Sequence, residues 1–240
     1  MKYVPLKFIK EDPSVGGSDS SEDIKEPTQL LERLVADLGR QLVALSPSSE
    51  PLRRADLLLQ LGRALVRLEK NPEAWGMARE AFDLYLAEES WEGAVQCCDI
   101  LFLADQELSL PALGQGIWLS VTFPVDPELS VALLQHVVDE TPPDSDGAAV
   151  AAITALYLTD LRVQEARREH LLLFVNQLLA TVARRHSGVE NQEDFNKWMS
   201  HMELNDPALF LPRLRNVVDV LVQDEWWFDR DALQARIPTE

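Results

Sequence analysis

Apolar residues recur at three- and four-residue steps along most of the chain, which is the spacing of amphipathic helices. Residues 28–45 place leucines and valines on one stripe, and residues 51–69 repeat the pattern. Between residues 72 and 106 the stripe is interrupted at Glu88-Glu89-Ser90, which predicts two helices joined by a tight corner. Asn71-Pro72 is typical of a helix start, because Asn can cap the first turn and Pro loses only an orphan donor there.

The second half of the chain continues the helical pattern. We expect short helices over 109–122 and 191–203, further helices starting at Asp126-Pro127 and Asp206-Pro207, and a long helical run over 148–186. Within that run, residues 148–158 are small and apolar enough to be fully buried. A break near Thr159-Asp160 would divide a run that is long for one globular helix.

These patterns predict an all-α fold of about nine to ten helices, stacked as antiparallel hairpins in a solenoid or an irregular bundle. Residues 1–27 are interpreted as a flexible tail and linker, because the stretch after residue 10 is rich in Gly, Ser, Asp and Pro. We expect residues 28–240 to form a single all-α domain. Its best internal boundary is 141–147, TPPDSDG.

Residues 55–88 resemble a tetratricopeptide repeat. Leu61-Gly62 stands where that family has its Leu-Gly pair, and Ala74 and Ala81 stand at its small positions on the second helix. In the family, such small residues let the two helices approach closely. The resemblance therefore implies closely packed helical hairpins and a scaffold for protein–protein interaction.

The chain also departs from that family. The usual aromatic residues are replaced by Leu58, Leu65 and Ala78, and the closing Pro is absent. A second partial match, residues 75–108, starts twenty residues after the first, so the two cannot be repeats in one register. The resemblance supports stacked hairpins but not a regular repeat array.

Charge is distributed unevenly along the chain, whose formal net charge is −18. Residues 81–160 contain fourteen Asp and Glu and no Lys or Arg, which leaves only −4 of the −18 for the rest. Such a middle region repels nucleic acid and anionic membranes and attracts a basic peptide or protein surface. The alternative is that the charge serves only solubility. The arginines of 162–185 form the one locally basic stretch, which we expect to pack against the acidic middle.

Residue types that carry chemistry are sparse. Cys97 and Cys98 are the only cysteines, and neighbours on a helix point too far apart to clamp a metal or form a good disulfide. The chain has no leader and no apolar run of membrane-spanning length. We therefore expect a soluble, cytoplasmic protein that does not bind membranes.

Motifs of catalysis are also missing, since there is no nucleophile elbow, no phosphate loop and no His-Glu-x-x-His. We therefore expect no enzyme and no cofactor. The alternative hypothesis is an all-α enzyme or metal-binding protein that uses a cluster within residues 186–206, namely His186, Glu190, Glu193, Asp194, His201 and Glu203.

The leading hypothesis is a non-enzymatic scaffold, adaptor or assembly chaperone that presents an acidic helical surface to a basic protein partner. Its candidate contacts lie in the acidic middle, at Asp83, Glu88, Glu89, Glu92, Asp99 and Asp105. Trp226 and Trp227 either cap the helical stack or bind a partner. Residues 1–10 are either a disordered terminus or a basic apolar strip that docks on the acidic face or on a second copy. The sequence does not determine the oligomeric state.

Overall fold

Residues 21–45 and 50–237 are described in a computed structural model of the protein. The regular structure of these residues is entirely helical and comprises eleven helices, which confirms the all-α prediction. Contacts between residues divide the chain into two compact units, residues 1–112 (unit 1) and 113–240 (unit 2). The predictions for residues 1–10 fall outside the described residues.

The division between the units differs from the boundary that the sequence indicated. Residues 141–147 are only the connection between two helices, α6 (Pro127–Glu140) and α7 (Asp146–Arg162), which pack against each other. A stretch rich in Pro and Asp ends a helix, but it does not separate cores. The residues typical of turns at 141–147 therefore mark the end of a helix, whereas the boundary between the two units lies elsewhere.

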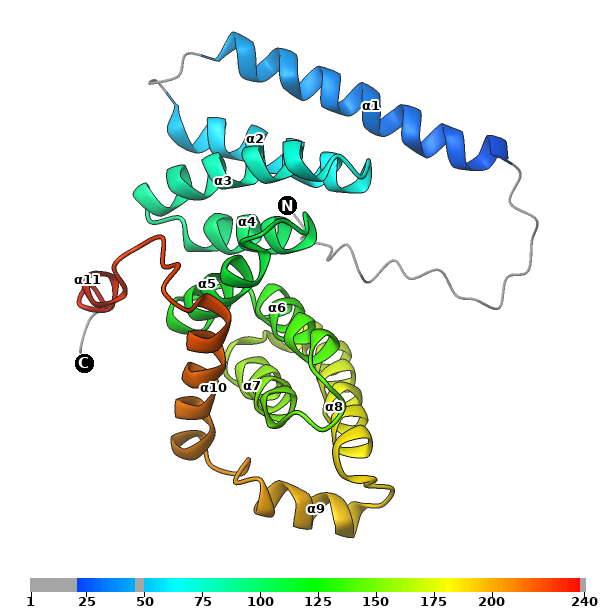
Figure 1. The fold of residues 1–240 in the computed structure, drawn as a ribbon, viewed down its shortest axis with the longest axis vertical. Coiled ribbons are helices and arrows are strands. Elements are labelled where there is room, and N and C mark those ends of the chain that lie inside the picture. Colours follow the sequence, from blue (N-terminus) through cyan, green and yellow to red (C-terminus); the bar gives the residue numbers. More distant parts are fainter. Residues whose placement is uncertain (1–20, 46–49, 238–240) are drawn as a thin grey trace. The chain divides into compact units, whose positions relative to one another are not determined.

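Unit 1 contains α1 (Ser21–Ala44), α2 (Pro51–Arg67), α3 (Asn71–Ala87) and α4 (Trp91–Leu103) (Figure 1). Helix α1 begins at Ser21, so the linker predicted up to residue 27 extends too far. Ser, Glu and Asp are favoured at helix N-termini, so the composition of 21–23 suits a first helical turn as well as a linker. The predicted start of α3 is confirmed, but Lys70 occupies the N-cap position and no side chain caps that helix.

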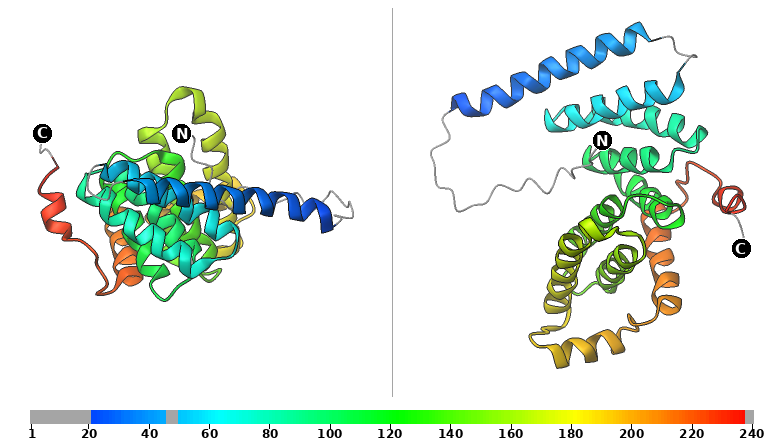
Figure 2. Two further views of the ribbon diagram at one scale, coloured as in Figure 1. Left: turned by 90° about the horizontal axis from the view of Figure 1, so that it is seen from above. Right: turned by 180° about the vertical axis from the view of Figure 1, so that it is seen from behind.

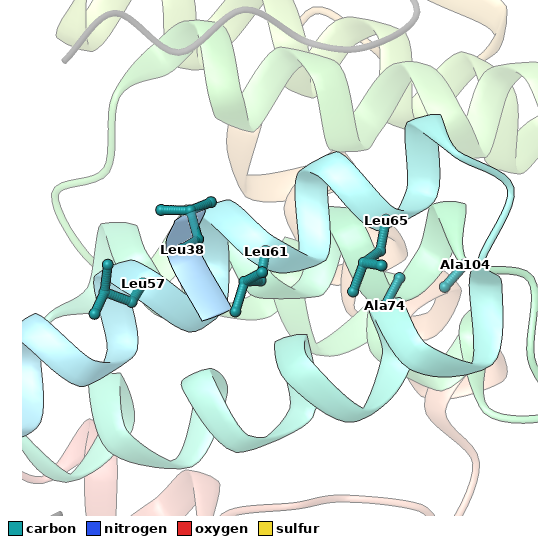
Figure 3. Packing of buried hydrophobic residues seen from close by; sticks show 6 residues of the cluster. All are labelled: Leu38, Leu57, Leu61, Leu65, Ala74 and Ala104. Atoms are coloured by element: carbon teal, nitrogen blue, oxygen red, sulfur yellow. The ribbon is translucent and has the colours of Figure 1, made fainter. Parts of the chain in front are cut away.

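Small residues allow α2, α3 and α4 to approach closely. A Cβ added to Gly62 of α2 would lie 3.3 Å from Cγ2 of Ile100 and 3.5 Å from the Ala74 carbonyl oxygen. Ala74 and Ala81 of α3 are completely buried. Figure 3 shows the buried cluster that joins α1, α2, α3 and the end of α4: Leu38, Leu57, Leu61, Leu65, Ala74 and Ala104. The close approach that the small residues implied is present, whereas membership of the tetratricopeptide family stays a prediction.

Unit 2 is organised around α7, which lies against α6, α8 (Glu165–Ser187) and α10 (Pro207–Val222) (Figure 2). Its residues from Ala148 to Ala155 and Leu158 are buried, but Leu156 and Tyr157 are partly exposed, so the predicted burial of residues 148–158 is confirmed only in part. The break in the 148–186 run falls at Val163 and Gln164, later than expected. Thr159 lies within α7, where its buried hydroxyl is satisfied by donating to the Ala155 carbonyl at 2.8 Å.

The remaining helices of unit 2 include one, at residues 230–234, that the sequence did not predict, whereas the other two begin and end close to their predicted limits. They are α5 (Ser109–Thr122), which crosses the division between the units, α9 (Gln192–His201) and the short α11 (Arg230–Gln234). Asp126 and Asp206 cap α6 and α10 as predicted, with side chains that accept hydrogen bonds from Glu128 N and Ala208 N. Helix α8 ends at Ser187 and is capped by Gly188, whose φ of 64° is the left-handed conformation that glycine adopts readily.

Arginines of unit 2 close the ends of other helices. The guanidinium of Arg162 donates to the carbonyl oxygens of Ser120 and Val121 at 2.5 and 2.7 Å, at the end of α5. Arg185 donates to the Val138 carbonyl oxygen at 2.8 Å, at the end of α6. The basic stretch thus reaches the middle of the chain as expected, but these two arginines bind helix carbonyls and not carboxylates.

Candidate functional site

The predicted acidic contacts occupy different places in unit 1. Glu88 and Glu89 form the connection between α3 and α4, and Glu92 lies in the first turn of α4; all three are exposed. We call this group the acidic corner. Asp105 is exposed beyond the other end of α4, about 20 Å away along a helix of 13 residues. Asp83 is exposed on α3 and pairs with Arg79.

Asp99 was wrongly assigned to the surface, because its exposed fraction is only 3%. Helix α4 is buried along residues 93–101 except at Gln96, so it has almost no solvent face for Asp99 to occupy. An amphipathic pattern assumes one polar side, and α4 lacks a continuous one. Asp99 is therefore not available as a partner contact.

Three acidic residues of unit 1 have left-handed backbone conformations. Glu69, Glu89 and Asp105 have φ values of 58°, 54° and 48°, and each stands two positions after the last residue of α2, α3 or α4. The helix ends are closed locally: Lys70 N donates to the Leu65 carbonyl, and Ser90 N to the Tyr85 carbonyl, both at 2.9 Å. Glycine is usual at such positions, because any other side chain costs about 1–2 kcal/mol there.

Helix dipoles also act on the carboxylates at these positions. The C-terminal end of a helix carries partial negative charge, which disfavours carboxylates and favours Lys or Arg. Glu89 therefore has a strained backbone, and its carboxylate lies between the C-terminus of α3, whose dipole disfavours it, and the N-terminus of α4, whose dipole favours it. The left-handed backbone at Glu89 is the feature that local stability does not explain. Residues that violate local rules are expected at positions where function imposes them.

Trp226 and Trp227 are half-buried against α5 in unit 2. The Trp226 ring packs edge-on against Trp118 at 6.2 Å between centroids, and the Arg230 guanidinium lies 4.0 Å over it. The buried Gln115 side chain holds the same segment, since its amide oxygen accepts from Trp227 N at 2.9 Å and its amide nitrogen donates to the Glu225 carbonyl at 3.4 Å. These contacts give the aromatic segment a packing role within its own unit.

A cleft of about 320 Å³ opens beside this segment. Sequence reasoning missed it, because its walls come from three separate helices of unit 2. Helix α5 contributes Trp118 and Val121, α10 contributes Leu211 and Arg215, and α11 contributes Arg230, together with Ile117, Thr122, Leu214, Val218, Asp231 and Gln234. Apolar side chains line part of the helical walls of the cleft, polar atoms contribute more than half of its accessible lining, and charges of both signs lie at its rim.

The metal hypothesis for residues 186–206 receives no support from the described geometry. His186 is engaged by other groups: Nε2 lies 3.1 Å from Asp146 Oδ1, and the Trp198 indole donates to Nδ1 at 3.3 Å. Among the residues that the structure describes, no group of three or more His, Cys, Asp or Glu side chains is arranged to hold a metal ion. The metal-binding alternative remains an untested hypothesis.

The two cysteines are also poor nucleophiles. Cys97 and Cys98 are completely buried, and burial raises the pKa of both thiols above the usual range. The thiolate is the reactive form of cysteine, so both side chains are expected to be inert at neutral pH. Their role is to fill the core of unit 1.

Comparisons of the chain with protein-family models, with curated proteins and with solved structures found no match. None of the helices in the described parts of the chain is long and apolar enough to cross a membrane.

Proposed function

We propose that the protein is a non-enzymatic interaction scaffold, such as an adaptor or assembly factor, that docks a basic segment of a protein partner on the acidic corner. The observation that carries this proposal is the conformation of Glu89, together with Glu69 and Asp105. Each places a carboxylate in a left-handed backbone conformation that is unfavourable for its residue type. A binding role for exposed carboxylates accounts for that local cost.

The surroundings of the corner support an electrostatic role. Residues 81–112 contain no Lys or Arg, and the nearest preceding arginine, Arg79, is paired with Asp83. The corner therefore presents three exposed carboxylates on a stretch of chain that carries no basic residue of its own. Opposite charge on a partner would raise the association rate and fix its orientation, and added salt would weaken both effects.

The test compares two triple variants as baits in capture from native lysate, washed at low and then at raised salt. One variant reverses the corner, Glu88→Lys, Glu89→Lys and Glu92→Lys. The other reverses three exposed acidic residues elsewhere, Asp144→Lys, Glu190→Lys and Asp224→Lys, so that the net charge changes equally. We expect the wild type and the second variant to retain a basic partner at low salt and the corner variant to lose it.

Equal loss in both variants would mean that only the net charge matters and would refute the acidic corner as the docking site. A partner whose binding does not weaken as the salt concentration rises would refute an electrostatic mechanism. The single change Glu89→Gly separates stability from function. It should stabilise the protein by about 1 kcal/mol by removing the left-handed strain, while weakening capture.

A further inference from the structure

The cleft between α5, α10 and α11 combines apolar side chains with two arginines. Its walls carry the partly exposed side chains of Trp118, Val121 and Leu211 above a buried floor of Ile117, Leu214 and Val218. Its rim carries two arginines, Arg215 and Arg230. Its volume of about 320 Å³ falls at the lower end of the range of small-molecule sites.

The two arginines have different roles. Arg230 is fixed by the fold, since its guanidinium donates to Asp219 Oδ1 at 2.8 Å and stacks on Trp226. Arg215 is held only loosely, because its nearest carboxylate oxygen, Asp219 Oδ2, is 3.8 Å away, beyond hydrogen-bond distance. Its side chain is 73% exposed. Arg215 therefore has donors to offer a ligand.

We propose that this cleft binds a small apolar carboxylate, whose hydrocarbon part packs on Trp118, Val121 and Leu211 and whose carboxylate pairs with Arg215. A planar guanidinium matches a carboxylate with two parallel hydrogen bonds, which makes arginine the preferred partner for this group. Apolar burial supplies the remaining affinity. The proposal is independent of the acidic corner, whose residues all belong to unit 1.

Asp231 is the one acidic residue in the lining, and it makes the sign of the ligand's charge testable. It is exposed, in the first turn of α11. A carboxylate ligand would be repelled by Asp231 and attracted by the arginines, whereas an ammonium ligand would reverse both effects. Neutralising Asp231 should therefore strengthen the binding of a carboxylate and weaken that of an amine.

The experiment titrates the full chain with three eight-carbon probes, octanoate, 1-octanol and octylammonium, by isothermal calorimetry at low salt. We expect octanoate to bind with a dissociation constant of the order of a millimolar, as ten non-hydrogen atoms allow. It should bind about fivefold to tenfold more tightly than octanol, with octylammonium weakest. Equal binding of octanoate and octanol, or no octanoate binding at such concentrations, would overturn the proposal.

Variants then assign the binding to the cleft. Arg215→Gln should weaken octanoate about fivefold to tenfold and leave octanol unchanged, and Asp231→Asn should strengthen octanoate. The control Arg184→Gln removes another exposed arginine, from α8 and outside the cleft, and should change neither affinity.

A second kind of variant fills the cleft. Leu211→Trp should abolish octanoate binding, and thermal melting followed by circular dichroism checks that the variant folds. Because Arg215 and Asp231 are exposed, their variants should fold even if Leu211→Trp does not. Octanoate that binds a folded Leu211→Trp variant as it binds the wild type would place the site elsewhere and overturn the proposal.

Discussion

Two helices of unit 1 and two helices of unit 2 are closed in different ways. In unit 1, α2 and α3 end with hydrogen bonds between residues five apart, from Lys70 N to Leu65 O and from Ser90 N to Tyr85 O. In unit 2, α5 and α6 end on the side chains of Arg162 and Arg185, which lie more than forty positions further along the chain. The first kind of closure is local, and the second exists only when distant helices have packed.

The two units also differ in how far apart in sequence their packed helices lie. Unit 1 stacks consecutive helices on each other, α1 on α2, α2 on α3 and α3 on α4. In unit 2, α7 packs on α10, and Gln115 of α5 holds the backbone of residues 225–227. Unit 1 is thus stabilised mainly by neighbours in sequence, and unit 2 depends more on contacts between distant segments. Their responses to substitution should differ accordingly.

The largest expected difference in stability between the two units comes from removing a side chain that binds the carbonyl groups at a helix end. Arg162→Met should destabilise unit 2 by about 2–3 kcal/mol, because two carbonyl groups at the end of α5 lose a charged donor. The matched change in unit 1, Lys70→Met, should stay within about 0.5 kcal/mol, since Lys70 closes α2 with its backbone N–H. Urea unfolding with hydrogen exchange measures both. Equal losses would contradict the distinction between local and distant closure.

Glycine-to-alanine changes probe the helix contacts themselves. A Cβ at Gly93 would lie 2.5–2.7 Å from the Tyr85 ring in unit 1, and one at Gly114 would lie 2.5 Å from Val222 Cγ2 in unit 2. Each change should cost about 1–3 kcal/mol by overpacking. Gly76→Ala meets nothing within 4 Å and should stabilise by up to about 1 kcal/mol. Thermal melting ranks the three. A stabilising Gly93→Ala would show that the α3–α4 contact is looser than described.

Alkaline pH should lower the stability of unit 1. Burial and a hydrogen bond to Asp56 raise the pKa of Tyr85 above its usual 10.0, and burial raises those of Cys97 and Cys98 above 9.0. Above these values the unfolded chain loses protons that the folded chain keeps. Stability is therefore fully present below pH 9 and falls as pH rises, by up to about 1.4 kcal/mol per pH unit for each group.

Urea unfolding between pH 8 and 10.5 checks this dependence, with hydrogen exchange to assign it to unit 1. The double variant Cys97→Ala with Cys98→Ala should lack the loss of stability that begins near pH 9, because the usual thiol pKa is 9.0. A wild-type stability that does not change over this range would contradict the burial of these groups. Unit 2 contains no cysteine, so its stability should not change with the thiol titration and serves as the internal reference.

The sequence by itself determined the all-α class and most helix limits, because these depend on neighbouring residues. In Asp126-Pro127 and Asp206-Pro207, the Asp caps the helix and the Pro occupies its first turn, and Gly188 caps the C-terminal end of α8. The burial of Ala148 to Ala155 in α7 also followed from its run of small apolar residues. The exposure of Glu88, Glu89 and Glu92 was predicted correctly for the same reason, since the residues of a polar corner turn outward wherever the hairpin packs.

Only the tertiary structure decided the burial of Asp99, the division of the chain at residue 112 and the cleft beside Trp118. Asp99 is buried because α4 is enclosed on most sides, which no pattern within α4 reveals. Arg162, Arg185 and Gln115 likewise find their partners between 41 and 112 positions away. Helical periodicity reports which residues face inward, whereas contacts across such distances depend on how the helices are placed in space.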